Sequence, residues 1–297
     1  MRVLVTGGTG FIGTALVKRL QDHGHAPVIL TRPGGRPPTS AASLEWETTS
    51  GPPPRDAWEG VDAVFNLAGE PANGRWTDAK KRRLRESRVG TTNRLIEGMA
   101  EISSPPRVMV SMSTSGYYGD RGDETLTEDA VAGEGFIPAL IRDWEVAAMA
   151  AEQLGVKVAR TRGGIVVGRH GPAWRRLLLV ANLGILGPVG GGQQWWSWIH
   201  LDDVTRFMVH ALENELSGAF NLATPDARRQ KDWAKTLARV LHRPGFVPAP
   251  AFAVRAVLGG FSGELLESRH MIPAAVLASG FEFSQPDLEP AFQDLIA

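Results

Sequence analysis

The sequence of 297 residues contains no cysteine and only two tyrosines, and its formal net charge is zero. Without cysteine the chain cannot form disulfides, thiolate nucleophiles or zinc–thiolate sites. Lys and Arg number 32 and Asp and Glu number 32, so the chain also lacks the positive charge that attracts nucleic acid or an acidic membrane surface. We therefore expect neither nucleic acid nor a membrane as a partner.

Long apolar runs are absent as well. The longest one, residues 177–186, is interrupted by Asn182 and Gly184 and is far shorter than the roughly 20 residues that a spanning helix needs. Residues 2–6 already have the pattern of a strand, so we expect no signal peptide before the fold. These features predict a cytoplasmic protein.

Short apolar runs do occur, and they alternate with amphipathic stretches. Residues 3–5, 28–30 and 63–65 are continuous and apolar, as in strands that are buried on both faces. Helical spacing of apolar residues follows such runs, for example over residues 137–152. The alternation predicts an α/β protein with a doubly wound, parallel, Rossmann-like sheet and a smaller, mostly helical C-terminal substrate domain.

The pattern loosens after about Gly163, which suggests where the domains divide. We predict an NADP-binding Rossmann-like domain over residues 1–165, to which residues 195–225 return. Residues 166–194 and 226–297 are predicted to form the smaller domain.

A glycine-rich turn, Gly7-x-x-Gly10-x-x-Gly13, joins the first strand to the first helix. Such glycines allow a tight turn and a close approach of the backbone to a pyrophosphate, and the helix N-terminus favours that negative group. The alternative is a turn with a purely structural role. The residues expected to touch a dinucleotide are Gly7, Thr9, Gly10, Phe11, Ile12 and Gly13.

The end of the second strand, Leu30-Thr31-Arg32, indicates which dinucleotide binds. An NAD site usually carries Asp or Glu here for the ribose 2′-hydroxyl, and this segment has neither. Arginine instead suits a 2′-phosphate, because it forms paired charge-assisted hydrogen bonds. We expect NADP(H) to be preferred over NAD(H), with Thr31 and Arg32 at the 2′-phosphate. A solvated loop position for Arg32 is the alternative.

Further motifs follow in one order: Asn66-Leu-Ala-Gly69, a Ser/Thr run before Tyr117-Tyr-Gly119, and Trp198-Ile-His-Leu-Asp-Asp203. With them the chain resembles the extended short-chain dehydrogenase/reductase superfamily of NAD-dependent epimerases and dehydratases. It is most similar to the group called epimerase family proteins, which carry a C-terminal domain of unknown function. The motifs of that group are Ala68-Gly-Glu70, Gly74-Arg-Trp-Thr77, Ser87-Arg-Val89, Gly116-Tyr-Tyr-Gly-Asp120, Arg142-Asp-Trp-Glu145, Ser197-Trp-Ile-His200 and Leu241-His-Arg-Pro244.

The resemblance implies a Rossmann-like sheet, a bound nicotinamide cofactor and a small-molecule substrate. Extended members are often dimers, so it also implies that the chain could form a homodimer. The strand end formed by Asn66, Leu67, Ala68 and Gly69 is expected to lie against the cofactor, where small residues let the backbone come close.

The catalytic pair of the superfamily is missing. Its members use a Ser or Thr together with Tyr-x-x-x-Lys, in which Tyr is the general acid/base and Lys lowers its pKa and holds the ribose. The two tyrosines here, Tyr117 and Tyr118, are followed four residues later by Arg121 and Gly122. Alignment on Glu145 places apolar residues where the pair is expected, namely Ile137 for Tyr and Ile141 for Lys.

Three residues are candidates to replace that chemistry. Ser113 matches the serine of the superfamily and could polarise a substrate carbonyl, while Tyr117 or Tyr118 could donate the proton. The alternative for the tyrosines is a role in shaping the pocket. His200 has a suitable pKa for acid–base work, but its segment is mostly structural in relatives, and Asp202 or Asp203 is expected to cap a helix.

The tryptophans Trp195, Trp196 and Trp198 crowd the strand that leads to His200. Alternation places Trp196 and Trp198 on one face and Trp195 on the other. They could form a pocket for an aromatic or apolar substrate, or they could pack as core between the domains. Arg175 and Arg176 keep an anionic nucleotide sugar open as a substrate.

Several charged residues have no assigned chemistry. Asp143 and Glu145 are expected to be solvated or to cap a helix, and residues 80–83 to form a solvated helix face. Glu70 follows the expected cofactor loop, where it could meet substrate or pair with Arg75.

Two functions fit these patterns. The first is an atypical NADP(H)-dependent short-chain dehydrogenase/reductase, an oxidoreductase or epimerase-like enzyme acting on a small molecule. The second is a non-catalytic NADP(H)-binding sensor that acts on a partner through its C-terminal domain.

Overall fold

The computed structural model describes residues 1–37 and 40–297. At its centre lies a seven-stranded sheet in which neighbouring strands pair in parallel, in the order β3-β2-β1-β4-β5-β7-β11. Its strands are β1 (Arg2–Thr6), β2 (Ala26–Thr31), β3 (Ala42–Glu45), β4 (Ala63–Asn66), β5 (Val108–Thr114), β7 (Lys157–Gly163) and β11 (Gly218–Leu222). The predicted parallel, Rossmann-like sheet is confirmed.

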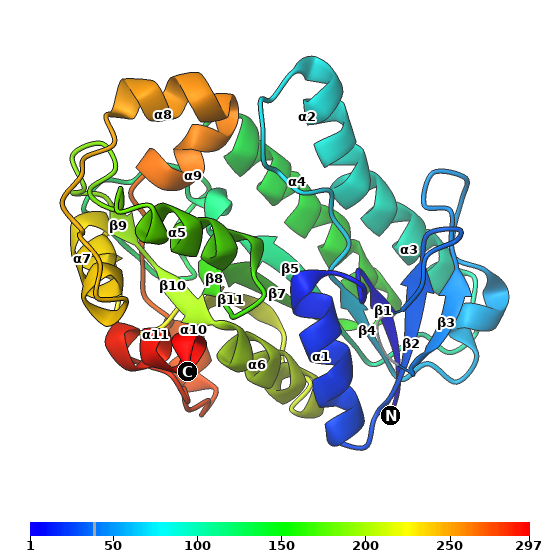
Figure 1. Ribbon diagram of the computed structural model, residues 1–297. Coiled ribbons are helices and arrows are strands. Elements are labelled where there is room, and N and C mark those ends of the chain that lie inside the picture. Colours follow the sequence, from blue (N-terminus) through cyan, green and yellow to red (C-terminus); the bar gives the residue numbers. More distant parts are fainter. Residues whose placement is uncertain (38–39) are drawn as a thin grey trace.

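Helices cover both faces of this sheet (Figure 1). Successive residues of β1 point to opposite faces, so Val3 and Val5 belong to one hydrophobic core and Leu4 to another. The first core includes residues of α1 (Phe11–Asp22) and α6 (Leu201–Glu213), and the second includes residues of α3 (Thr91–Ala100) and α4 (Phe136–Met149). This two-sided burial explains the continuous apolar runs in the sequence.

The helical segment before β5 is interrupted by a wider turn. It consists of α2 (Asp78–Arg85), the π-helical turn η2 (Glu86–Gly90) and α3, and the Thr77 side chain caps its start by accepting from the Lys80 amide. π-Helical turns inside α-helices occur frequently at functional sites. In this protein the wide turn carries Arg88, whose position is described below.

Shorter elements complete the chain. Parallel pairs join β8 (Ile165–Val167) to β10 (Trp198–His200) and β6 (Thr125–Leu126) to β13 (His270–Met271), and an antiparallel pair joins β9 (Trp195–Trp196) to β12 (Arg228–Arg229). The other α-helices are α5 (Pro172–Asn182), α7 (Gln230–Val240), α8 (Ala251–Leu258), α9 (Gly263–Leu266), α10 (Ala274–Ala278) and α11 (Leu288–Ile296). Short 3₁₀ turns are η1 (Arg55–Trp58), η3 (Ser115–Tyr117), η4 (Ala150–Leu154) and η5 (Gly259–Ser262).

The C-terminal region is mostly helical, as expected, and has a core of its own. Trp196 and Trp198 are buried there together with Trp174 and Trp233, so these tryptophans pack as core. Trp195 lies outside that core, stacked on His270 with ring centroids 4.1 Å apart. The predicted domain limits stay a prediction, although β11 and α6 do return to the central sheet. Over the described ranges, no helix has the length and apolar character to cross a membrane.

Candidate functional site

The glycine turn lies at the carboxyl edge of the sheet, between β1 and α1. Its three glycines are required for different reasons. Gly7 has φ +69°, and a Cβ there would come within 2.7 Å of the Leu67 backbone. A Cβ on Gly13 would overlap the Gly7 carbonyl oxygen. At Gly10, by contrast, an added Cβ would meet only that oxygen, at 3.2 Å. Gly10 therefore keeps an exposed backbone open to approach, whereas Gly7 and Gly13 allow the turn to close.

The first turn of α1 follows Gly10, and among the described residues no side chain hydrogen-bonds to its first amides. Uncapped amides at a helix N-terminus attract an anion. Thr9 and Gly10 are exposed, and Ile12 is half-buried. The Phe11 ring lies toward Gly168 and Gly171, where an added Cβ would come within 2.8 Å of it. These residues fit the pyrophosphate of a dinucleotide, with Phe11 contributing its backbone.

At the end of β2 the two predicted residues differ in exposure. Thr31 is buried, and its hydroxyl donates to the Leu44 carbonyl at 3.5 Å. The Arg32 side chain is exposed, and no hydrogen bond or ion pair joins it to another described residue, although its charge contributes to lowering the pKa of Glu47. Arg32 is thus the residue of this pair whose side chain can reach a ligand.

Asn66, at the end of β4, has its side chain fully occupied within the fold. Its amide donates to Thr92 Oγ1 at 2.8 Å and to Ser111 Oγ at 3.2 Å, and its Oδ1 accepts from Thr6 Oγ1 at 3.0 Å. The Thr6 hydroxyl in turn accepts from the amides of Leu67 and Ala68. The Asn66 side chain therefore shapes the loop, while Leu67, Ala68 and the exposed Gly69 form the surface of that loop.

Arg88 lies beneath this loop and was not singled out from the sequence. A Cβ on Gly69 would come within 3.3 Å of the Arg88 guanidinium carbon, and the other side of the guanidinium faces the Trp144 ring. Nη1 donates to the Glu70 carbonyl at 3.1 Å, but the buried Nε has no partner among the described residues. Burial lowers the pKa of Arg88, an effect that Glu70 partly offsets. The half-buried Arg88 guanidinium thus lies directly against this loop, with one buried donor that has no partner among the described residues.

Ser113 is completely buried at the end of β5 and donates to Glu145 Oε1 at 2.6 Å. Glu145 is only 3% exposed, so the expectation that it is solvated or a cap is wrong. Arg162 on β7 donates two hydrogen bonds to the same carboxylate, from Nε to Oε1 at 2.8 Å and from Nη2 to Oε2 at 2.9 Å. The Ser113 hydroxyl proton is thus committed to a buried ion pair and does not point to a substrate.

Tyr118 is also completely buried. Its hydroxyl donates to Asn221 Oδ1 at 2.7 Å and accepts from Arg162 Nη1 at 2.9 Å. Burial raises the pKa of Tyr118 to about 12, because the neighbouring Arg162 cation offsets only part of the desolvation of the phenolate. Tyr118 therefore remains protonated and ties the turn to β11.

This pKa predicts that Tyr118 resists ionisation in the folded protein. In a Tyr117→Phe variant, Tyr118 is the only tyrosine left, so the absorbance of phenolate at 295 nm reports on it alone. We expect no phenolate near pH 10, where an unfolded tyrosine titrates. Because the folded state keeps the proton more tightly, this group makes stability fall as pH rises from about 10 through 12. A reversible midpoint near pH 10 without unfolding would contradict the burial of Tyr118.

Tyr117 is the partly exposed member of the pair. Its ring lies on the Arg162 guanidinium at 3.6 Å, and no hydrogen bond joins its hydroxyl to any residue that the structure describes. The helix that faces this turn presents apolar side chains. A Cβ on Gly116 would come within 2.6 Å of Ile137 and 3.8 Å of Ile141, the two positions expected to replace Tyr and Lys.

His200 is the N-cap of α6, since its Nδ1 accepts from the Asp202 amide at 3.2 Å. The expectation that Asp202 or Asp203 caps this helix is therefore wrong. Asp203 instead accepts from the amides of Ser284 and Gln285 and holds the C-terminal segment. His200 lines a pocket of about 290 Å³ between α1, α6 and α11, and none of residues 7–13 lines that pocket.

Glu70 pairs with Lys80 at 2.6 Å and with Arg83 at 3.2 Å, so its partner is not Arg75. The Lys80 side chain is only 13% exposed, which corrects the expectation of a solvated face at that residue. In the described part of the chain, no group of three or more His, Asp or Glu side chains is arranged to hold a metal ion.

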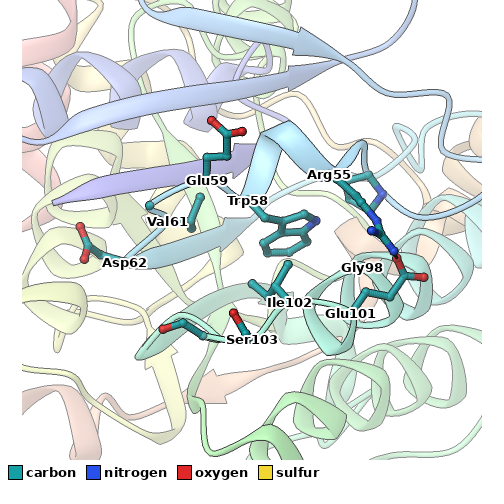
Figure 2. A pocket seen from close by; sticks show the side chains of 12 residues that line it. Arg55, Trp58, Glu59, Val61, Asp62, Gly98, Glu101, Ile102 and Ser103 are labelled. Carbon is teal, nitrogen blue, oxygen red and sulfur yellow. Dashed lines mark ion pairs between the residues drawn. The ribbon is translucent and has the colours of Figure 1, made fainter.

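A further pocket, of about 520 Å³, lies at the amino edge of the sheet. Figure 2 shows Trp58 and Ile102 in its wall and the Arg55–Glu101 ion pair at its rim. None of the predicted cofactor residues lines it. We therefore do not assign the dinucleotide to this pocket.

The fold and the arrangement at the carboxyl edge define a Rossmann-like α/β protein. The model of the NAD dependent epimerase/dehydratase family matches residues 3–223, and a domain of unknown function (DUF1731) matches residues 249–295. The chain therefore belongs to the NAD dependent epimerase/dehydratase family, and the resemblance seen in its motifs is confirmed.

Its relatives match along nearly the whole chain. It is 32% identical over 299 residues to the epimerase family protein YfhF of Bacillus subtilis (strain 168), covering 100% of this chain and 98% of that protein. It is 35% identical over 305 residues to the epimerase family protein SDR39U1 of Homo sapiens, covering 100% of both. The crystal structure of human SDR39U1 (isoform 2) with NADPH matches at a TM-score of 0.88 and 33% identity, covering 99% of each chain.

Proposed function

We propose that this protein is an atypical NADP(H)-dependent oxidoreductase or epimerase-like enzyme that acts on a small molecule without a Tyr-x-x-x-Lys pair. The observation that carries the NADP(H) assignment is the exposed Arg32, at a strand end that has no Asp or Glu, beside the uncapped N-terminus of α1. The similar human protein was crystallised with NADPH, which supports the same preference here.

The residues at the carboxyl edge fit a dinucleotide whose pyrophosphate lies at the end of β1 and whose two halves extend to either side of that strand. Gly10 and the first amides of α1 would hold the pyrophosphate, and Arg32, after β2, would hold the 2′-phosphate. Because β4 lies on the opposite side of β1 from β2, Gly69 and Arg88 would meet the nicotinamide half. When bound, the cofactor supplies or accepts a hydride.

Tyr117 is the candidate for proton transfer, because its hydroxyl forms no hydrogen bond with another residue that the structure describes. In a reduction, the substrate carbonyl gains a hydride at carbon and a proton at oxygen, and Tyr117 would donate that proton and recover it from water. Arg162, fixed by Glu145 and Tyr118, holds the Tyr117 ring in place. Ser113 supports this arrangement through its hydrogen bond to Glu145. In this proposal Tyr117, and not Ser113, is the group that would contact the substrate carbonyl.

Replacing Arg32 by alanine tests the cofactor assignment. A hydrogen bond to a charged group contributes about 1.5–3 kcal/mol, so we expect NADPH to bind roughly 10- to 150-fold more weakly and NADH to bind unchanged. Dissociation constants from calorimetry measure both. Arg55→Ala, a similarly exposed arginine at the amino edge, is the control and should change neither. Equal affinities of the native protein for NADPH and NADH would refute the preference.

A sensor is the second candidate, and one contact favours it. Arg75, in the loop that follows the expected cofactor loop, donates to the Ala256 carbonyl of α8 at 3.3 Å. A change at the cofactor could reach the C-terminal region by this route. Tight NADPH binding without oxidation of NADPH by any quinone or aldehyde in a broad panel would favour the sensor.

A further inference from the structure

The side chains beside Tyr117 form a continuous apolar wall. Ile137 packs against Gly116, which precedes Tyr117, and Phe136 is the next residue along α4. The Phe136 ring contacts the Trp76 ring, with centroids 5.9 Å apart and planes inclined by 59°. All four side chains, those of Tyr117, Ile137, Phe136 and Trp76, are half-buried, so each keeps some surface for a ligand.

The wall continues into the C-terminal region. A Cβ on Gly260, in η5, would come within 2.5 Å of Trp76 Cε3, so only glycine lets that backbone lie against the indole. The Trp76 Nε1 donates to the Ala72 carbonyl at 2.7 Å, which fixes the ring from its own loop. Trp76 is thus held between the two parts of the chain, at the place where Figure 1 shows α8 and α9 beside the segment that leads into α2.

Several cations near this wall are neutralised within the protein, but the Lys81 ammonium, 5.3 Å from the centroid of the Phe136 ring, forms no ion pair with another described residue. Lys80 and Arg83 pair with Glu70, and Arg162 pairs with Glu145. Arg269, which reaches the Gly119 carbonyl, pairs with Glu264 and Glu267. The diphosphate of a nucleotide sugar needs unpaired cations, and burying a charge without a partner is costly. Close to Tyr117, the paired Arg162 and Arg269 therefore offer no free positive charge to a diphosphate.

Building on the proposed function, we propose that the substrate is a flat, apolar carbonyl compound of the aromatic aldehyde or quinone class, bound against Ile137, Phe136 and Trp76. The apolar surface that the sequence suggested at Trp196 and Trp198 is supplied instead by this wall. An aromatic ring in contact with Trp76 and Phe136 gains packing beyond its buried area. Its carbonyl oxygen would face the Tyr117 hydroxyl.

Calorimetry on the protein saturated with NADP⁺ tests this without turnover. The probes are 2-naphthaldehyde and UDP-glucose. We expect 2-naphthaldehyde to bind at least 10-fold more tightly than UDP-glucose. Ile137→Gln and Trp76→Ala should each weaken it at least 5-fold, whereas Val146→Gln, on the exposed face of α4, should not change it.

The same titrations separate the two proposals. The first step measures NADP⁺ binding, and its absence would refute the proposed function and this inference together. If NADP⁺ binds but 2-naphthaldehyde does not bind up to its solubility, or UDP-glucose binds more tightly, only the apolar substrate is refuted. Unchanged affinity in both wall variants, with their thermal unfolding as in the native protein, would likewise overturn it.

Discussion

Replacing Arg162 by methionine is expected to lower the free energy of unfolding by about 3–5 kcal/mol, because it leaves the Glu145 carboxylate buried without a counter-charge. The variant also removes the donor to Tyr118 and the support of the Tyr117 ring. For a chain of this size the melting temperature should fall on the order of 10 °C. Thermal denaturation followed by circular dichroism measures the change.

A double-mutant cycle separates the ion pair from general damage to the core. Glu145→Met alone leaves Arg162 buried without its carboxylate and should also destabilise strongly. With both residues replaced by methionine, no unpaired charge remains, so the double variant should be more stable than the sum of the single effects predicts. Strictly additive losses would show that the pair has no coupled role. Arg85→Met, which breaks the exposed pair with Asp143, is the matched control and should change the melting temperature little.

Gly10→Ala is expected to leave the fold intact and to reduce NADPH affinity at least 100-fold. The added Cβ meets only one backbone oxygen, at 3.2 Å, but it stands on the exposed backbone that a pyrophosphate would approach. Gly13→Ala is expected to damage both properties, since its Cβ would overlap the Gly7 carbonyl oxygen inside the turn. Calorimetry with NADPH and thermal unfolding are measured on both variants.

The test compares stability and NADPH binding between the Gly10→Ala and Gly13→Ala variants. A purely structural turn predicts that Gly10→Ala leaves NADPH binding unchanged and stability nearly so, because the added methyl group makes only one tight contact, with the Gly7 carbonyl oxygen at 3.2 Å. Native stability together with lost binding identifies Gly10 as a contact of the dinucleotide. If Gly10→Ala binds NADPH as well as the native protein, the pyrophosphate does not lie on this turn.

The parts of the site that could be predicted from the sequence are those formed by residues close together along the chain. The glycine turn and the Thr31–Arg32 strand end each lie within a few residues, and the parallel strands β1 and β2 that precede them end at the same carboxyl edge. The parallel sheet itself followed from apolar runs alternating with helices. For these elements, the spacing along the chain already determines the placement in space.

The buried network could not be predicted in the same way. Ser113 and Glu145 are 32 residues apart and Tyr118 and Asn221 are 103 apart, so their contacts exist only after the sheet has formed. Glu145 looked solvated because it stands beside Asp143 in a helix, although the helix turns one toward the core and the other outward. Arg162 is itself buried, on a strand that has neighbours on both sides, and a buried arginine needs a partner. The position of Arg88 could not be predicted, because the π-helical turn shifts which side chains of the helix face the core.

The most direct test of the central claim is a crystal structure of the protein with NADPH. The proposed enzyme predicts that the 2′-phosphate lies on Arg32, that the pyrophosphate lies over Gly10, and that the nicotinamide C4 is open toward the Tyr117 hydroxyl and the wall at Ile137. A nicotinamide ring covered by protein on its reactive face, with Tyr117 out of reach of C4, would contradict catalysis and leave the binding of NADPH as the activity of the chain.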